Sequence, residues 1–309
     1  MDTLILVDDY LPESGFTLVQ QIDQQPGGAT AISAVAAARL GANVSLVSRV
    51  GQDDLGDDLL TALTAEGIDT SRIHRLPERP TDETIVLISR STGQRTIFLK
   101  QGARPSLGAT LDIDSLFSDS ICLVDVDDLS LFRFLVDLPV HTHPTARLLG
   151  TMTYLAEHPG KATDEILQRL DAVVGSDRDI VALTGTSTLN AALWKIQHLM
   201  CGSNLRFAAI ITGANGAYGV SPDQLWHVEP HHVETLDTTG AGDAFTGALA
   251  YALALRWNPT ETLQLCSIVA GILTGHLGAQ TGLPTMAGVR EVLENRPPAV
   301  TEVKLPLKR

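Results

Sequence analysis

The sequence has 309 residues, of which 44% are hydrophobic and 19% are charged, with 22 Lys and Arg against 36 Asp and Glu. This composition is typical of a well-packed globular protein and excludes intrinsic disorder. The net charge of −14 argues against a nucleic-acid partner or an acidic membrane surface. No apolar stretch is long enough to span a membrane, and no leader pattern opens the sequence. The three cysteines are predicted to be reduced thiols, so we expect a cytoplasmic protein.

Four segments alternate apolar and polar residues, as antiparallel strands with one exposed face do. They are Thr3–Val7, Phe16–Ile22, Thr84–Ser89 and Thr96–Lys100. The stretch Ser91–Gln94 predicts a hairpin turn between the last two. We expect these segments to form a small β-sheet from residues near 3–23 and 84–101, inserted into a larger domain.

Four short, continuous apolar runs indicate buried parallel strands. They are Val44–Val47, Ile121–Val126, Ala172–Val174 and Ala208–Thr212. Helix-length stretches occupy most of the remaining sequence: Thr30–Leu40, Gly56–Glu66, Ala162–Leu170, Ser187–Met200, Ala241–Leu255, Pro259–Gly275 and Ala287–Asn295. This alternation predicts a single α/β domain over residues 1–309, with a mostly parallel central sheet flanked by helices on both faces. The tail, Arg296–Arg309, is predicted to be an extended arm.

The strongest chemical signal lies in Asp237–Phe245, where Gly240 and Gly242 flank Ala241 just before a predicted helix. Glycines at this place let the backbone turn tightly and present consecutive N–H groups at the positive end of the helix dipole. Such a nest binds an oxyanion, and Asp243 within the first turn can accept a proton from a substrate hydroxyl. A loop with an aspartate helix cap is the alternative. No G-x-x-x-x-G-K-[ST] pattern is present, which excludes a P-loop nucleotidase.

A second glycine pair, Gly27 and Gly28, precedes the alanine-rich helix predicted at Ala31–Leu40. Glycines before a helix let a ligand contact the backbone, and close packing is the alternative explanation. The stretch Gly27–Gly67 resembles the first signature of the ribokinase-like (PfkB) carbohydrate kinases. The stretch Asp237–Gly247 resembles their second signature, and the resemblance extends from Asp2 through Pro284.

The resemblance implies a ribokinase-like fold with a β-sheet lid over the sugar. It implies ATP-dependent transfer of phosphate to a sugar hydroxyl, with Mg²⁺ on the nucleotide phosphates. By their positions in the second signature, Asp243 corresponds to the general base, while Gly240, Ala241 and Gly242 correspond to the anion hole.

The same resemblance places Asp2 at the acid that holds sugar hydroxyls, and Gly27 and Gly28 at the glycines beside the sugar. Asp127, at the end of a predicted buried strand, is a further candidate sugar contact, because ligands gather beyond the carboxyl ends of strands. A helix cap at Asp127–Asp128 is the alternative. Three basic lid residues are candidates for binding a phosphate or carboxylate, with solvated surface charges as the alternative: Arg95, Lys100 and Arg104.

For the nucleotide, the resemblance points to the loop Thr212–Gly216, where Thr212, Gly213 and Gly216 approach the phosphates. It also points to His276 and the stretch Gly278–Gly282 as the wall beside the adenine.

For metals, Asp237 and Thr239 correspond to residues that bind a monovalent cation such as K⁺ in many relatives, although some branches lack the ion. Asp179, in the stretch Ser176–Asp179, stands where relatives have the glutamate of an Asn-x-x-Glu motif near the metal. Its shorter side chain implies an altered geometry, and Asp177 is an alternative for the same role.

Two further departures affect substrate binding. Ile32 stands where many relatives have an asparagine that contacts the sugar, so the sugar site is not that of a ribokinase proper. Relatives also have a central strand before the aspartate that corresponds to Asp2. We therefore expect the natural start to lie upstream of Met1, with Asp2 poorly fixed on a frayed terminus and sugar binding weak.

The lid is expected to join two copies of the chain in a homodimer, because its exposed face is half apolar. The residues of that face are predicted to be Leu4, Leu6, Phe16, Leu18, Ile97 and Phe98. Two alternatives to a sugar kinase stay open: a nucleoside or vitamin-precursor kinase on the same fold, and a catalytically silent ligand-binding member. The altered Ser176–Asp179 stretch favours the silent member, whereas the intact Asp243 and Gly240–Gly242 favour an enzyme.

Overall fold

The computed structural model describes residues 1–10, 14–92, 95–105, 117, 121–138 and 146–304. The chain divides into two compact units. The first unit consists of Met1–Pro105, His232–Gly247 and Val269–Val289, and the second of Ser106–His231, Ala248–Ile268 and Arg290–Arg309. The turn predicted at Ser91–Gln94 lies partly outside the described residues.

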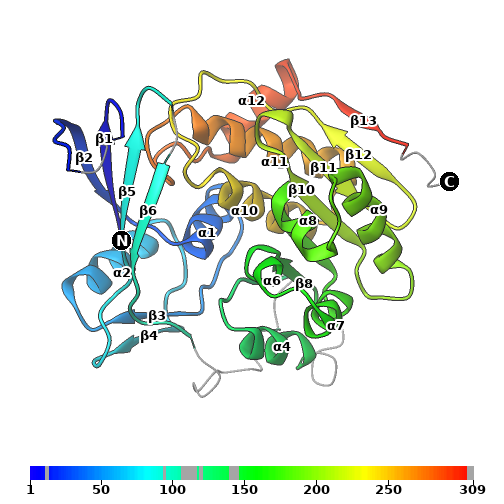
Figure 1. The fold of residues 1–309 in the computed structure, drawn as a ribbon, viewed down its shortest axis with the longest axis horizontal. Helices are drawn as coiled ribbons and strands as arrows, with labels where there is room; N and C mark the ends of the chain where they lie inside the picture. Colours follow the sequence, from blue (N-terminus) through cyan, green and yellow to red (C-terminus); the bar gives the residue numbers. More distant parts are fainter. Residues whose placement is uncertain (11–13, 93–94, 106–116, 118–120, 139–145, 305–309) are drawn as a thin grey trace. The chain divides into compact units, whose positions relative to one another are not determined.

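The first unit carries a four-stranded sheet in the order β2-β1-β5-β6 (Figure 1). Its strands are β1 (Asp2–Val7), β2 (Val19–Gln25), β5 (Glu83–Ser89) and β6 (Arg95–Lys100). β1 runs antiparallel to β2 and parallel to β5, and β5 runs antiparallel to β6. The two stretches of sequence predicted to form this sheet, near residues 3–23 and 84–101, therefore pair in one sheet, which we call the lid sheet.

One face of the lid sheet has a small apolar core, in which Leu4, Val86 and Ile88 are each no more than 2% exposed. Leu6 packs against this cluster. The prediction that Leu4 and Leu6 belong to the exposed face is therefore wrong. Alternation along β1 and β5 brings their apolar side chains to the same side of the sheet, where they cover one another.

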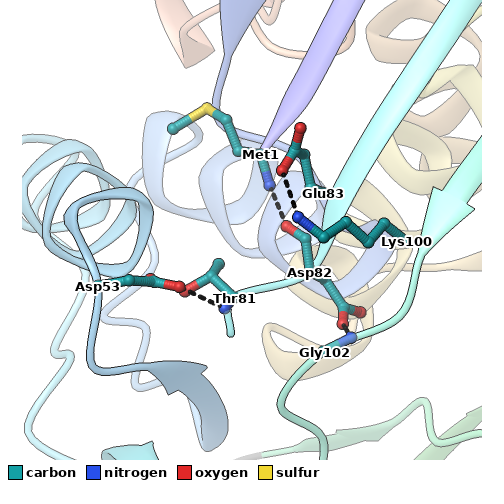
Figure 2. A network of polar contacts seen from close by, with 7 residues as sticks. All are labelled: Met1, Asp53, Thr81, Asp82, Glu83, Lys100 and Gly102. Carbon is teal, nitrogen blue, oxygen red and sulfur yellow. Dashed lines mark hydrogen bonds and ion pairs between the residues drawn. The ribbon is translucent and has the colours of Figure 1, made fainter. Parts of the chain in front are cut away.

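Hydrogen bonds hold the start of the chain at the end of the lid sheet where β1 and β5 begin (Figure 2). The Met1 ammonium donates to the carbonyl oxygen of Asp82 at 3.0 Å, and the Thr84 N–H donates to the Met1 carbonyl at 2.9 Å. Asp2 opens β1 and is buried. The expectation of a frayed terminus is wrong, because pairing with β2 and β5 fixes these residues on both sides.

Asp53 links the segment before β5 to a helix. As the N-cap of α2 (Asp54–Ala65), it accepts from the Gly56 N–H at 3.0 Å. Its carboxylate also accepts from the N–H of Thr81 at 2.8 Å and from the Thr81 hydroxyl at 2.5 Å, as Figure 2 shows. One side chain thus caps the helix and fixes the segment that leads into β5.

A two-stranded parallel sheet pairs β3 (Ser48–Gly51) with β4 (Ile73–Leu76). The prediction of a buried strand at Val44–Val47 is wrong, since only an isolated bridge joins Ser45 to Asp69 there. The ladder begins at Ser48 because β4 supplies partners only from Ile73 onward.

The second unit contains a seven-stranded sheet in the order β13-β12-β11-β10-β9-β8-β7 (Figure 1). Its strands are β7 (Cys122–Val124), β8 (Leu148–Thr151), β9 (Ala172–Ser176), β10 (Phe207–Ile211), β11 (Ala217–Val220), β12 (Leu225–Val228) and β13 (Val300–Glu302). The strands β7 to β10 are mutually parallel, and three antiparallel strands extend the sheet. The apolar runs predict β7, β9 and β10, whereas none of them predicts β8. Part of the predicted C-terminal arm forms the edge strand β13, whereas residues 305–309 lie outside the description.

Helices flank the seven-stranded sheet. The first unit has α1 (Ala29–Arg39) and α2, and the second has α4 (Leu129–Asp137), α6 (Thr153–Glu157), α7 (Lys161–Arg169), α8 (Asp177–Thr184) and α9 (Leu189–Met200). Three further helices contribute to both units: α10 (Ala241–Ala254), α11 (Pro259–Thr274) and α12 (Met286–Asn295). Phe132, Met152, Ile180 and Leu193 are fully buried in the core of the second unit. Among the described residues, no helix combines the length and apolarity needed to cross a membrane.

Candidate active site

The N-terminus of α10 is built on a left-handed glycine. Gly240 has φ of 76°, and a Cβ atom there would lie 2.8 Å from the Cβ of Ala279. Only glycine fits both constraints. The helix begins at Ala241, whose N–H donates to the carbonyl oxygen of Thr238 at 3.3 Å, and the N–H groups of its first turn lie at the positive end of the helix dipole. Asp243 lies within that same turn.

Close packing of α1 on α10 fixes Asp243. The Ser33 hydroxyl of α1 donates to the carbonyl oxygen of Asp243 at 2.9 Å. A Cβ atom on Gly247 would lie 2.2 Å from the carbonyl oxygen of Ser33, which shows how near the two backbones come. The two signature stretches are therefore in direct contact, about two hundred residues apart in sequence but adjacent in the first unit.

Asp237 organises the loop that precedes α10. Its Oδ1 accepts from the N–H of Thr239 at 2.9 Å and from the Thr239 hydroxyl at 2.7 Å, while its Oδ2 accepts from the N–H of Gly278 at 2.9 Å. The carboxylate is buried. Both oxygens thus hold protein groups, and any monovalent cation at Asp237 and Thr239 would have to share this carboxylate.

Asp2 and Gly27 lie against one another. A Cβ atom on Gly27 would lie 2.1 Å from the carboxyl carbon of Asp2, so glycine is what leaves room for this carboxylate. Burial raises the pKa of Asp2, and the neighbouring N-terminal ammonium and a hydrogen bond with Thr84 offset only part of that shift. Gly28, with φ of 99°, is the N-cap of α1.

Ile32 points into the core of the first unit, where it is 3% exposed. Its side chain therefore offers no polar group to a sugar. The buried Asp2 carboxylate is the polar group that the first unit does provide beside the glycine pair.

The nucleotide candidates of the second unit form a tight turn. Thr212 donates from its N–H and its hydroxyl to the carbonyl oxygen of Gly216, each at 2.9 Å. Gly213 and Gly216 both have positive φ, at 60° and 82°, within and just after the 3₁₀ turn Gly213–Asn215. A Cβ atom on Gly216 would lie 2.0 Å from the carbonyl oxygen of Val228. His276, the other nucleotide candidate, belongs to the first unit and is exposed.

Asp179 takes part in a helix cap. The Ser176 N–H donates to its Oδ2 at 2.8 Å, and the Asp179 N–H donates to the Ser176 hydroxyl at 3.2 Å, which makes a capping box at the start of α8. Asp127 is exposed beside Asp128, whose side chain caps α4. Within the described ranges, no group of three or more His, Cys, Asp or Glu side chains forms a metal site.

The first unit thus brings together most of the predicted site. Asp2, Gly27, Gly28, Asp237, Thr239, Gly240, Ala241, Gly242, Asp243 and His276 all belong to it. The second unit holds Asp127, Asp179, Thr212, Gly213 and Gly216. Sequence reasoning missed the contact of Ser33 with Asp243. It named Arg95 only as an anion contact, whereas the Arg95 guanidinium donates to the hydroxyl of Thr238 at 2.9 Å.

Comparison with known proteins decides the family. Residues 1–286 match the profile of the pfkB family carbohydrate kinases. The chain belongs to the PfkB family. It is accordingly a phosphotransferase whose acceptor is an alcohol group, as the two signature stretches imply.

Individual PfkB-family members show how broad the resemblance is. The ribokinase of Haemophilus influenzae is 28% identical over 291 residues, with 93% of each chain covered. The fructokinase of Vibrio alginolyticus is 25% identical over 298 residues, with 90% of this chain and 94% of that enzyme covered. The structure of Arabidopsis thaliana ribokinase complexed with ribose and ATP superposes with a TM-score of 0.81 at 20% identity, covering 95% of both chains. The ribokinase-like fold is therefore confirmed, while relatives of similar identity are named for different sugars.

Proposed function

We propose that this chain transfers the γ-phosphate of ATP to a hydroxyl group of a sugar or sugar derivative. The observation that carries the proposal is the start of α10, where the left-handed Gly240 precedes a helix with Asp243 in its first turn. This arrangement combines an anion-binding backbone with a carboxylate at one place.

In the proposed reaction, Asp243 accepts the proton of the substrate hydroxyl as that oxygen attacks the γ-phosphorus. The bond from the γ-phosphorus to the bridging oxygen breaks, and ADP leaves with the electron pair. The amides of Gly240–Gly242 hold the transferring phosphoryl group. Because the transition state for phosphoryl transfer is loose, positioning and charge stabilisation matter more than a strong base.

For the sugar, we propose that Asp2, Gly27 and Gly28 form the binding surface. A carboxylate accepts hydrogen bonds from hydroxyl groups, and Gly27 leaves space beside it. Asp127 remains a proposed additional contact. The buried Ile32 supports a sugar site that differs from that of a ribokinase proper.

For the nucleotide, we propose Thr212, Gly213 and Gly216 beside the phosphates and His276 beside the adenine. Glycines with positive φ fit a loop whose backbone approaches a ligand. The Arabidopsis ribokinase, which shares the fold, forms a complex with ATP, and this supports ATP as the nucleotide.

Mg²⁺ commonly binds through substrate phosphates with only one or two protein carboxylates. We propose that Asp179 supplies a protein carboxylate for Mg²⁺. Bound there, Mg²⁺ would neutralise charge on the phosphates. A monovalent cation such as K⁺ is proposed near Asp237 and Thr239, whose oxygens are of the type that such ions bind.

The test is a panel of pentoses, hexoses, keto-sugar acids, nucleosides and vitamin precursors with ATP, read by ADP release. Turnover with a sugar or sugar acid supports the proposal. Turnover only with a nucleoside or vitamin precursor would replace it with that class of kinase. ATP binding without turnover on any acceptor would indicate a catalytically silent member.

We also propose a homodimer joined through the lid sheets. Several large apolar side chains on or beside this sheet are at least 40% exposed: Phe16, Leu18, Val19, Ile22, Ile85, Ile97, Phe98 and Leu99. Apolar clusters of this kind mark interaction surfaces, and a second copy presents the same patch. Light scattering at micromolar protein tests it, because a monomer mass would contradict the proposal. The cytoplasmic location stays a prediction.

A further inference from the structure

Arg39, the last residue of α1, directs its guanidinium group to two targets at once. Its Nε and Nη2 donate to the two carboxylate oxygens of Glu66, at 2.9 and 2.6 Å. Its Nη1 donates to the backbone carbonyl oxygens of Gln280 and Leu283, at 3.0 and 2.8 Å. Four donated hydrogen bonds fix this side chain, and the ion pair is about three-quarters buried.

The two carbonyl oxygens belong to the loop 276–283, which lies between α11 and α12 and has no regular secondary structure. Within this loop the Leu283 N–H donates to the Gln280 carbonyl at 3.2 Å. Arg39 therefore adds two hydrogen bonds from outside the loop to this one within it.

The same loop contacts the candidate site. The N–H of Gly278 in this loop donates to the carboxylate of Asp237. Ala279 of the loop lies so close to Gly240 that a Cβ atom added to Gly240 would clash with it. The anion-hole turn is therefore packed directly on the loop that Arg39 holds.

The loop also reaches the lid sheet. Leu277 packs on the apolar core of that sheet, and the side chain of Gln25 lies beside Gly278. A shift of loop 276–283 would therefore alter its contacts with the anion-hole turn and with the lid sheet.

We propose that Arg39, oriented by Glu66, is a positioning residue that holds loop 276–283 in place for nucleotide binding. The proposal rests on the proposed function, in which His276 and Gly278–Gly282 form the wall beside the adenine. Arginine suits this role because its planar fork serves a carboxylate and two carbonyls together, whereas a lysine ammonium is a single point charge. Glu66 uses both oxygens to orient the fork.

The experiment compares Arg39→Lys and Glu66→Gln with the wild type. The control is Arg133→Lys, which changes an arginine on α4 paired with Glu165 at 2.8 Å and far in sequence from the candidate nucleotide residues Thr212–Gly216 and His276. Three quantities are measured: the dissociation constant for ATP, kcat on the acceptor that the substrate panel identifies, and amide hydrogen exchange of peptides covering 276–283.

For Arg39→Lys, we expect ATP binding about tenfold weaker, as the loss of one or two charge-assisted hydrogen bonds predicts, while kcat changes by about twofold at most. Exchange should be faster in 276–283 and unchanged in the peptide that contains Asp53. Glu66→Gln should shift both readouts the same way but less, because glutamine keeps one acceptor oxygen. The Arg133→Lys control should match the wild type.

Unchanged exchange of 276–283 in Arg39→Lys would overturn the proposal, whatever the activity. So would faster exchange throughout the first unit, because Arg39 would then serve only general stability, and so would a fall in kcat with unaltered ATP affinity. If the loop loosens and ATP binding weakens although the wild type phosphorylates no acceptor, the positioning role stands and the proposed function fails.

Discussion

The carboxylate of Asp237 accepts a hydrogen bond from the backbone N–H of Gly278, 41 residues later in the chain, at 2.9 Å. The other oxygen of the same carboxylate holds Thr239, immediately before the turn at Gly240. One buried side chain therefore ties the anion-hole loop to loop 276–283. The conformation at the start of α10 therefore depends on these hydrogen bonds as well as on the glycines.

Replacing Asp237 by Asn should destabilise the protein and lower its turnover. The amide group would present N–H donors where the carboxylate now accepts from N–H groups, and a buried pair of donors facing each other costs about 1–3 kcal/mol. Urea unfolding measures the change in the free energy of unfolding. Asp223→Asn, at an exposed position, is the control and should leave both stability and turnover unaltered. If Asp237→Asn is as stable as the wild type, the hydrogen bonds of Asp237 do not hold the two loops together.

Gly27→Ala should weaken sugar binding while ATP binding persists. The new Cβ atom would occupy the space of the Asp2 carboxyl group, 2.1 Å away, and must displace it. We expect a KM for the sugar at least about tenfold higher and a stability loss of about 1–3 kcal/mol from overpacking. The control is Gly288→Ala in α12, where the nearest atom outside the helix is 4.0 Å away. That variant should be as active as the wild type and up to about 1 kcal/mol more stable.

Asp2→Asn should raise stability near neutral pH and reduce sugar affinity. Burial raises the pKa of Asp2 in the folded protein, with the N-terminal ammonium and Thr84 acting against it. A carboxyl group with a raised folded pKa stabilises the fold fully below its unfolded pKa, and this contribution is lost as the pH rises through the folded pKa. The Tm of the variant should therefore exceed that of the wild type at neutral pH, with the difference vanishing in acid. Thermal unfolding from pH 3 to pH 7, which spans the ordinary carboxyl pKa of about 4, checks this. A variant less stable at neutral pH would show that the charged form is favoured instead.

Local chemistry explains what the sequence could predict. The left-handed turn at Gly240 and the helix that follows need only neighbouring residues, so their signature is readable in the sequence. The lid strands show their alternation because one face covers Leu4, Val86 and Ile88. The parallel strands β7, β9 and β10 overlap continuous apolar runs, as buried strands do.

Contacts between residues far apart in the sequence explain which features the sequence could not predict. The apolar run Val44–Val47 is not a strand because the ladder of β3 begins where β4 provides partners. Arg39 bonds carbonyl groups more than two hundred residues away, and no local pattern signals that. For Asp179 a signal did exist. A serine three residues before an acid is typical of a capping box, and the structure shows that box.

The central claim is that Asp243 takes the proton from the acceptor hydroxyl. The direct measurement is the turnover of Asp243→Asn on the identified acceptor, together with its affinity for ATP. We expect kcat to fall by about 10²–10⁴, the usual contribution of a general base, while ATP binds as it does to the wild type. Near-normal turnover by Asp243→Asn would contradict it.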